Sequence, residues 1–437
     1  MSIFFYFLLS LFFILFAWLA KKSWLTAVGL LCLFLPSFEI RFQLWLLPST
    51  VLELMLIIIL GWWLIEIWQQ KRYRQVFLAN PLFWPALFLL LSATLALLPA
   101  PDLRSALGYW KAYFLEPILL FFALADRLTD YKKIQKFLVW LGAGALLIAS
   151  VGIYQKFTGW LLPAGEWFNP ETRRVTAFFT SPNAVTLATV PTALLYLGWL
   201  IQRWQTKYFW QTKLEKFYTV WQVIVIIAII TVSIFARSRG AWFAGLVAVI
   251  FILFFGWSKK YTSYLTTLGL LSLTLWPKIY QAIVNLLSFK VVSGTIRLNI
   301  YEQTLAWLKL NWLTGLGLGG FEYYYLQLTQ RGEKIAYLYP HNILLNFWVE
   351  LGFLGLLASL YLLSKFFIQG FKTLKISSAY WLLLGVLAAM VEIIAHGLVD
   401  VPYFKNDLAI IFWLVPALLV ILVKNPSLIL NHKPVKL

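Results

Sequence analysis

The chain has few charged residues for its length. Only 12% of its 437 residues are charged, and 62% are hydrophobic. A soluble globular domain carries about 25% charged residues, so this composition excludes that class. The apolar runs have the length of membrane-spanning helices, whereas a membrane barrel shows alternation in segments of about ten residues. We therefore predict an all-α, polytopic membrane bundle in which residues 1–437 form a single membrane domain.

The chain also lacks the usual residues of metal and nucleotide sites. Its one cysteine, Cys32, excludes an intrachain disulfide and a cysteine-based metal site. The sequence contains no Asp-x-Asp pair, no His-Glu-x-x-His motif and no P-loop. We predict that the protein uses no metal and no cofactor. The net charge of +19 does not indicate a nucleic-acid partner, because lysine and arginine cluster in short connections between apolar runs.

The apolar runs predict about 12 to 13 transmembrane helices, and the first of these is expected to be a retained anchor. Their predicted bounds are 3–20, 24–38, 50–68, 82–99, 108–126, 134–155, 183–201, 219–236, 240–257, 260–276, 342–365, 379–399 and 405–423.

Basic clusters occupy alternate connections, beginning with Lys21-Lys22 and with Lys71 to Arg74. The positive-inside rule places these connections in the cytoplasm. The remaining connections then face outward, including the long one at 277–341. We predict a multi-pass membrane protein in which this long connection lies on the outer side. The outward residues are Arg173, Arg174, Arg237, Arg239, Arg297, His341, His396 and Asp400.

The connection at 277–341 is predicted to contain short helices. Thr295 to Trp312 has helical apolar periodicity and is expected to lie on the membrane surface. A glycine run follows, with Gly315, Gly317 and Gly319, and it permits either close approach to a ligand or a flexible hinge. The tyrosines at 323–325, 337 and 339 suit either sugar stacking or interfacial anchoring, and the interfacial role is the commoner one.

A polar stretch opens the span after this loop. At about 100° per residue, Asn342, Asn346 and Glu350 fall within roughly 80° of one another, with His341 at the helix entrance. Polar residues in a membrane helix usually face a bundle interior or a watery cavity, which favours a functional site. The alternative is an interfacial histidine, a pair of asparagines between helices and a Glu350 paired with arginine. Gly352 and Gly355 would let another helix approach closely.

Outward arginines contradict the charge bias of the other connections. Arg237 and Arg239 flank a very short turn, and Arg174 and Arg297 are expected on the same side. Because the guanidinium fork binds phosphate oxygens in pairs, these side chains suit a pyrophosphate. The alternative is that they reach lipid head groups or pair with the carboxylates of Glu116, Glu350 or Glu392.

These segments resemble the O-antigen ligase and O-antigen polymerase superfamily of bacterial membrane proteins. The similarity covers residues 170–360. One departure is visible, since many relatives have a proline before the glycine run where this chain has residues 311–314. The resemblance is carried by Arg174 to Asn183, Ser238 to Trp242, Arg297, Trp307, Gly315 to Phe321, His341, Asn342, Gly352 and Gly355.

The resemblance implies a glycosyltransferase that moves a glycan from undecaprenyl pyrophosphate to an acceptor hydroxyl. It also implies a multi-pass protein of the bacterial cytoplasmic (inner) membrane whose active site faces the outside or periplasm. It implies that Arg174, Arg239 and Arg297 hold the pyrophosphate, with Arg237 beside them, and that His341 orients or deprotonates the acceptor. A neutral histidine is a reasonable base near neutral pH. Glu350 is a second catalytic candidate. Without an obvious carboxylate pair for a covalent intermediate, we expect direct displacement with inversion and no metal.

Other functions remain open at the level of sequence. A transporter or flippase for a lipid-linked or anionic substrate would use Glu350, Glu392, His396 and Asp400 as coupling residues, although no internal repeat is evident. A scaffold for envelope proteins leaves the arginines unexplained. Within the enzyme class, the acceptor can be a glycan, a glycolipid or a protein, and membrane lipids are expected partners.

Overall fold

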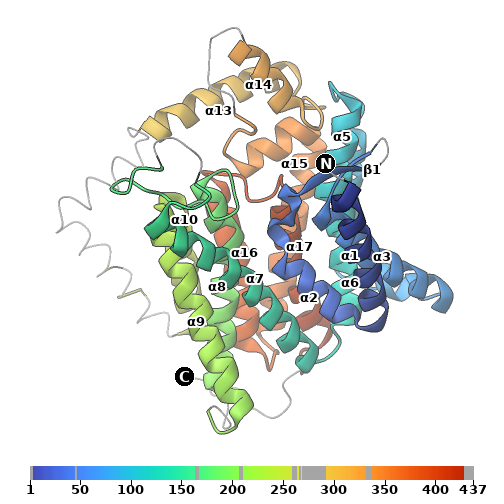
Figure 1. Cartoon of the computed structure of the whole chain (residues 1–437), viewed down its shortest axis with the longest axis vertical. Coiled ribbons are helices and arrows are strands. Elements are labelled where there is room, and N and C mark those ends of the chain that lie inside the picture. Colours follow the sequence, from blue (N-terminus) through green and yellow to red (C-terminus); the bar gives the residue numbers. More distant parts are fainter. Residues whose placement is uncertain are drawn as a thin grey trace.

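The computed structural model describes residues 3–44, 47–162, 167–205, 210–257, 263, 264, 267, 292–330 and 337–427. It confirms an all-α polytopic bundle (Figure 1). Within these ranges, ten helical segments are long and apolar enough to cross a membrane. They are α1 (Ile3–Lys22), α3 (Val51–Gln70), the run α5 (Leu103–Tyr109), η3 (Trp110–Leu115) and α6 (Glu116–Arg127), α7 (Tyr131–Thr158), α8 (Pro182–Trp204), α9 (Lys213–Ala236), α10 (Arg239–Gly256), α15 (Ile343–Leu374), α16 (Tyr380–Gly397) and α17 (Asn406–Lys424).

Two predicted spans are shorter helices, α2 (Trp24–Leu33) and α4 (Phe83–Leu95). The predicted span at 260–276 lies outside the described residues, apart from isolated positions. Two of the three spans by which the predicted and observed numbers differ are therefore α2 and α4, which have 10 and 13 residues. At a rise of 1.5 Å per residue, neither reaches the roughly 30 Å of a hydrocarbon core.

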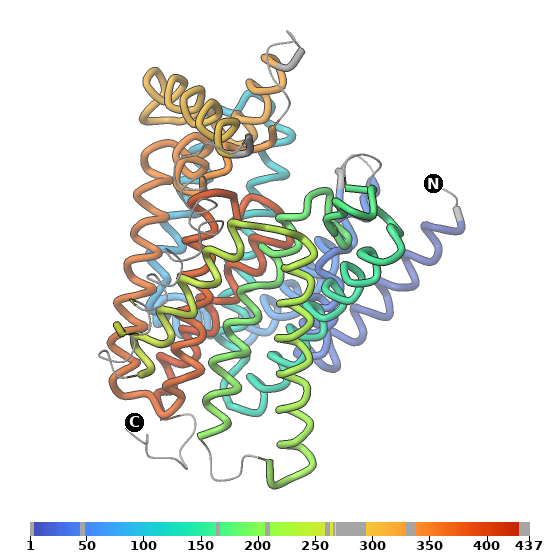
Figure 2. Tube along the Cα trace, turned by 90° about the vertical axis from the view of Figure 1, so that its left-hand side faces the viewer, coloured from blue at the N-terminus to red at the C-terminus, as the bar shows by residue number. Residues whose placement is uncertain are grey.

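The centre of the bundle is formed by α8, α16 and α17, whose side chains are buried on nearly every face. Small residues let α8 and α16 pack closely. A Cβ on Gly198 would lie 2.5 Å from the carbonyl oxygen of Trp381 and 2.7 Å from the Cα of Gly385. Backbone contact of this kind is how membrane helices gain packing energy without a hydrophobic driving force. By contrast, α1 lies at the edge and exposes Phe4, as expected of a lipid-facing helix (Figure 2).

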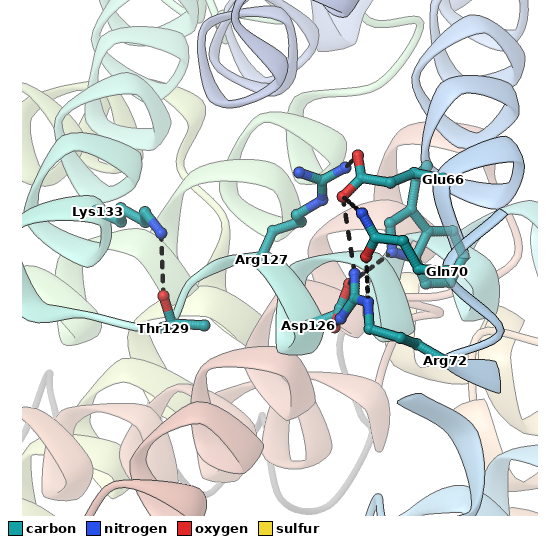
Figure 3. Close-up of polar contacts among 8 residues, drawn as sticks. Glu66, Gln70, Arg72, Asp126, Arg127, Thr129 and Lys133 are labelled. Atoms are coloured by element: carbon teal, nitrogen blue, oxygen red, sulfur yellow. Dashed lines mark hydrogen bonds and ion pairs between the residues drawn. The ribbon is translucent and has the colours of Figure 1, made fainter. Parts of the chain in front are cut away.

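The bundle has two chemically different ends, named here the Lys71 end and the His341 end after residues that lie there. At the Lys71 end, Arg72 bonds Asp126 at 2.9 Å and Arg127 pairs with Glu66 (Figure 3). Trp63 donates its indole N–H to Asp126 at 3.1 Å. These pairs hold α3 against α6 at the end where the sequence predicts basic, cytoplasmic connections.

The His341 end is covered by α13 (Val292–Leu310) and α14 (Gly320–Gln330), which lie across the top of the bundle in Figure 1. The helix predicted at 295–312 is thus present as α13, and its place on the membrane surface stays a prediction. A small hairpin of β1 (Arg41–Leu44) and β2 (Leu47–Thr50) also lies at this end and was not predicted. Four-residue strands give too short an alternation to stand out among apolar helices.

The long helix α15 is interrupted at Gly352, whose φ is 71° and ψ is −173°. The loop after α13 enters this break. Leu316 donates its N–H to the carbonyl of Val349 at 2.6 Å, and Phe353 donates to the carbonyl of Leu313 at 3.0 Å. A Cβ on Gly352 would lie 2.2 Å from the Leu313 oxygen. The sequence predicted that Gly352 lets another helix approach closely. Its neighbour is instead the backbone of the loop between α13 and α14, residues 311–319, named here the glycine loop.

Candidate active site at the His341 end

His341 occupies the entrance of α15 in a strained conformation. Its φ of 52° lies in the left-handed region, which non-glycine residues rarely adopt and which clusters at functional sites. Asn342 is the N-cap, because its side-chain oxygen accepts from Leu344 and Leu345 N–H at 3.0 and 3.1 Å. Tyr301 on α13 donates its hydroxyl to the carbonyl of His341 at 3.1 Å. The cap and α13 together fix the position of the imidazole.

The imidazole of His341 pairs with a buried carboxylate. Its Nδ1 lies 3.2 Å from Oδ1 of Asp400, a residue 1% exposed in the connection between α16 and α17. Asn183 donates to the other carboxylate oxygen at 2.9 Å. Burial raises the pKa of Asp400, but the hydrogen bond and charge of His341, with the charges of His396 and Arg297, outweigh burial and hold the pKa below its usual range. Asp400 is therefore an ionised, fixed partner for the histidine.

This pairing has a chemical consequence for His341. A carboxylate on Nδ1 fixes the tautomer and ring orientation, and it stabilises the charge that develops when the ring takes a proton on Nε2. About 20% of the His341 side chain is exposed, so the ring stays reachable. The rings of Tyr337 and Tyr339 stand edge-on to it at 5.7 and 5.0 Å between centroids. The site is thus a reachable imidazole with aromatic walls.

Two of the predicted arginines lie beside this pair. Arg174 donates from Nη2 to Oδ1 of Asn183 at 3.3 Å and from Nε to the carbonyl of Ala236 at 2.9 Å. A chain of contacts therefore runs from Arg174 through Asn183 and Asp400 to His341. Arg297 on α13 has a buried Nε without a hydrogen-bond partner in the described residues. Its charge contributes to the lowered pKa of Asp400.

The other two arginines occupy the turn between α9 and α10. Arg237 ends α9 with a φ of 49° and donates to the carbonyl of Glu171 at 3.3 Å, so its side chain is directed to the 160–175 connection. Arg239 is exposed and is the first residue of α10. The contacts therefore join Arg174 and Arg297 to the histidine–aspartate pair, place Arg239 at a helix N-terminus and leave Arg237 outside the pair.

Glu350 binds the glycine loop. Its carboxylate accepts the N–H of Gly319 at 2.5 Å and of Phe321 at 3.2 Å, and the residue is 5% exposed. This geometry positions the loop, and the predicted catalytic role of Glu350 stays a prediction. Gly315, Gly317 and Gly319 have φ values of 66°, 80° and 77°, which other residues adopt only with strain.

The three residues of the predicted polar stripe, Asn342, Asn346 and Glu350, do not share one partner. Asn342 caps α15 and Glu350 binds the glycine loop. Asn346 is 1% exposed, and its side-chain oxygen lacks a hydrogen-bond partner in the described ranges. Gly355 follows the break in α15 and is also buried.

The sequence predicts that Asp400 lies on the same side of the membrane as His341, but it does not pair the two residues. It also did not assign Asn183 or Tyr301 to the site, because contacts between distant segments leave no local pattern.

A metal site is not evident at the His341 end. Over the ranges that the structure describes, no group of three or more His, Cys, Asp or Glu side chains is placed to hold a metal ion. The expectation of metal-free chemistry therefore stays a prediction that needs a chelation experiment.

The fold and the site define a multi-pass membrane protein whose long helices enclose a histidine–carboxylate pair at one end. Residues 223–360 match the family model Wzy_C, described as O-antigen ligase. The match supports the O-antigen ligase and polymerase superfamily that the resemblance indicated, and it indicates glycan transfer of that type. It includes Arg239, Arg297 and His341, whereas Arg174 and Asp400 lie outside it. No curated protein matches the chain.

Proposed function

We propose that the protein is a metal-independent, inverting glycosyltransferase. It moves a glycan from undecaprenyl pyrophosphate to an acceptor hydroxyl at the outer face of the bacterial cytoplasmic membrane. The observation that carries this proposal is the chain of contacts from Arg174 through Asn183 and Asp400 to His341. It links a phosphate-binding type of side chain to a base within one set of hydrogen bonds.

In this mechanism, Nε2 of His341 takes the proton of the acceptor hydroxyl as its oxygen attacks the anomeric carbon. The bond between that carbon and the phosphate oxygen breaks, and its electron pair stays with the pyrophosphate. Asp400 stabilises the imidazolium until the proton leaves through the exposed side of the ring. Arg174, Arg239 and Arg297 balance the charge of the pyrophosphate, which makes it a good leaving group.

A single displacement inverts the anomeric centre. A double displacement needs a free carboxylate near the sugar to form a covalent intermediate. Asp400 and Glu350 are both engaged, because Asp400 accepts from Asn183 and Val401 and Glu350 accepts from two loop N–H groups. This supports direct attack by the acceptor.

Reconstitution tests the proposed function. Purified protein in liposomes is given a glycan on undecaprenyl pyrophosphate with candidate glycan, glycolipid and protein acceptors, with and without a chelator. We expect a product of inverted anomeric configuration by NMR at equal rates in both conditions. Retention of configuration contradicts the displacement, and loss of transfer with chelator contradicts the metal-free mechanism.

A further inference from the structure

A second histidine–carboxylate pair is buried in α16 and has no part in the mechanism above. Nδ1 of His396 lies 3.0 Å from Oε1 of Glu392, and each side chain is 1% exposed. Two ionisable groups inside a membrane helix are costly, and they usually mark a functional site. The pair therefore needs an explanation beyond packing.

His396 lies between Asp400 and the first turn of α10. Its carbonyl accepts the N–H of Asp400, in the connection that follows α16, at 3.0 Å. The edge of its ring opposite Glu392 faces α10. A Cβ on Gly240 would lie 3.3 Å from Cδ2 and 3.4 Å from Nε2 of His396. The imidazole thus stands between Glu392 and the first turn of α10.

The first turn of α10 has unused hydrogen-bond donors. Its N-cap residue, Ser238, makes no side-chain cap bond to it. The Ser238 hydroxyl is buried, the residue is 2% exposed, and the oxygen has no partner among the described side chains and backbone. The N-terminal N–H groups of a helix, with the positive end of its dipole, bind anions readily. A buried hydroxyl without a partner at such a turn is a second sign of a missing ligand.

We propose that His396, hydrogen-bonded to Glu392, binds the pyrophosphate of the lipid-linked donor together with the first turn of α10. This inference rests on the proposed function and adds His396 and Ser238 to the donor-binding residues. Glu392 is essential to the role. Its hydrogen bond to Nδ1 fixes the orientation of the ring, so that Nε2 faces the first turn of α10, where Nε2–H can donate to a phosphate oxygen.

The pairing also explains why these polar groups can be buried. Each satisfies the other with a hydrogen bond, and the pair has no net charge, so the membrane interior does not hold an isolated charge. The donor still gains a charge-assisted hydrogen bond from Nε2–H, which is about twice as strong as a neutral one. The two pairs then divide the reaction. His341 is reachable and serves the acceptor, and His396 is buried and serves the leaving group without giving up its proton.

Binding of undecaprenyl pyrophosphate tests this inference. The dissociation constant is measured in nanodiscs for the wild type, His396→Gln, Glu392→Gln and the control His432→Gln in the carboxyl-terminal tail. We expect His396→Gln and Glu392→Gln to weaken binding about tenfold or more, as loss of one charge-assisted bond implies. We expect the control to match the wild type. Wild-type affinity in a folded His396→Gln protein overturns the inference.

A measurement on the wild type covers the case in which the variants do not fold. The chain has three histidines, so ¹⁵N-histidine labelling gives three imidazole pairs of NMR resonances, which His341→Gln and His432→Gln assign by subtraction. Undecaprenyl pyrophosphate should shift the Nε2 resonance of His396. An unchanged resonance in a protein that binds the lipid overturns this inference alone. A wild type that does not bind the lipid overturns the proposed function as well.

Discussion

Nδ1 of His341 lies 3.2 Å from Oδ1 of Asp400. This contact joins the entrance of α15 to the connection between α16 and α17. The two residues are 59 positions apart in the chain. Their pairing gives the histidine a fixed orientation and a partner for the charge it gains.

Asp400→Asn should lower turnover while donor binding is kept. The amide has the size of the carboxylate but cannot stabilise an imidazolium, and loss of such an orienting partner typically costs about 10- to 100-fold in activity. The measurement is kcat for transfer beside the dissociation constant for undecaprenyl pyrophosphate. A variant with wild-type kcat would show that Asp400 has no part in the reaction.

Arg297→Lys should weaken donor binding although it keeps the positive charge. Lysine lacks the planar fork that binds two phosphate oxygens, so we expect a loss of about tenfold. Arg237→Lys is the matched control. Arg237 is exposed and contacts the carbonyl of Glu171 instead of the histidine–aspartate pair, so its affinity should stay within about twofold. Equal losses in both variants would contradict a specific role for Arg297.

Gly352→Ala should destabilise the protein and detach the glycine loop from α15. Its φ of 71° is unfavourable for alanine, and the new Cβ would lie 2.2 Å from the carbonyl oxygen of Leu313. We expect a loss of several kcal/mol, the sum of backbone strain and overpacking. Gly61→Ala in α3 is the control, because a Cβ there meets nothing within 4 Å. Thermal unfolding and protease cleavage within 313–320 measure the difference, and equal melting temperatures would contradict it.

The stability that Asp400 contributes should persist in mild acid. Its folded-state pKa lies below its unfolded value of about 3.9. The contribution is therefore complete above the unfolded value and is lost only as the pH falls through the folded value. We expect Asp400→Asn to lower the free energy of unfolding by about 1–3 kcal/mol at both pH 5 and pH 8. A difference that disappears between pH 8 and pH 5 would contradict an ionised Asp400.

Most spanning helices could be predicted from sequence because membrane spans leave long, local apolar patterns. The bounds of α8, predicted at 183–201 and observed as Pro182–Trp204, differ by a few residues. The break in α15 could not be predicted. Gly352 alone is compatible with a continuous helix, and the break depends on backbone hydrogen bonds from Leu316 and to Leu313 in a distant loop.

The candidate site could be predicted for charged or titratable residues that fall on the predicted outer side of the membrane. His341 and the arginines stood out because charged groups are costly in a membrane protein and contradict the bias of its connections. The roles of Asp400 and Asn183 required three-dimensional contact between segments 217 residues apart. Glu350 also stood out, as part of the polar stripe on its helix. Its contacts with the N–H groups of Gly319 and Phe321 could not be predicted from sequence, and its catalytic role stays a prediction.

The most direct test of the central claim is the rate of glycan transfer from undecaprenyl pyrophosphate by His341→Ala and Arg239→Ala proteins in liposomes, with Arg237→Ala as the control. A proton acceptor and a phosphate clamp each typically contribute 10²- to 10⁴-fold. We predict losses of at least 10²-fold in the first two proteins and a control close to the wild type. Transfer at the wild-type rate in both His341→Ala and Arg239→Ala would contradict the assignment of the site to the His341 end.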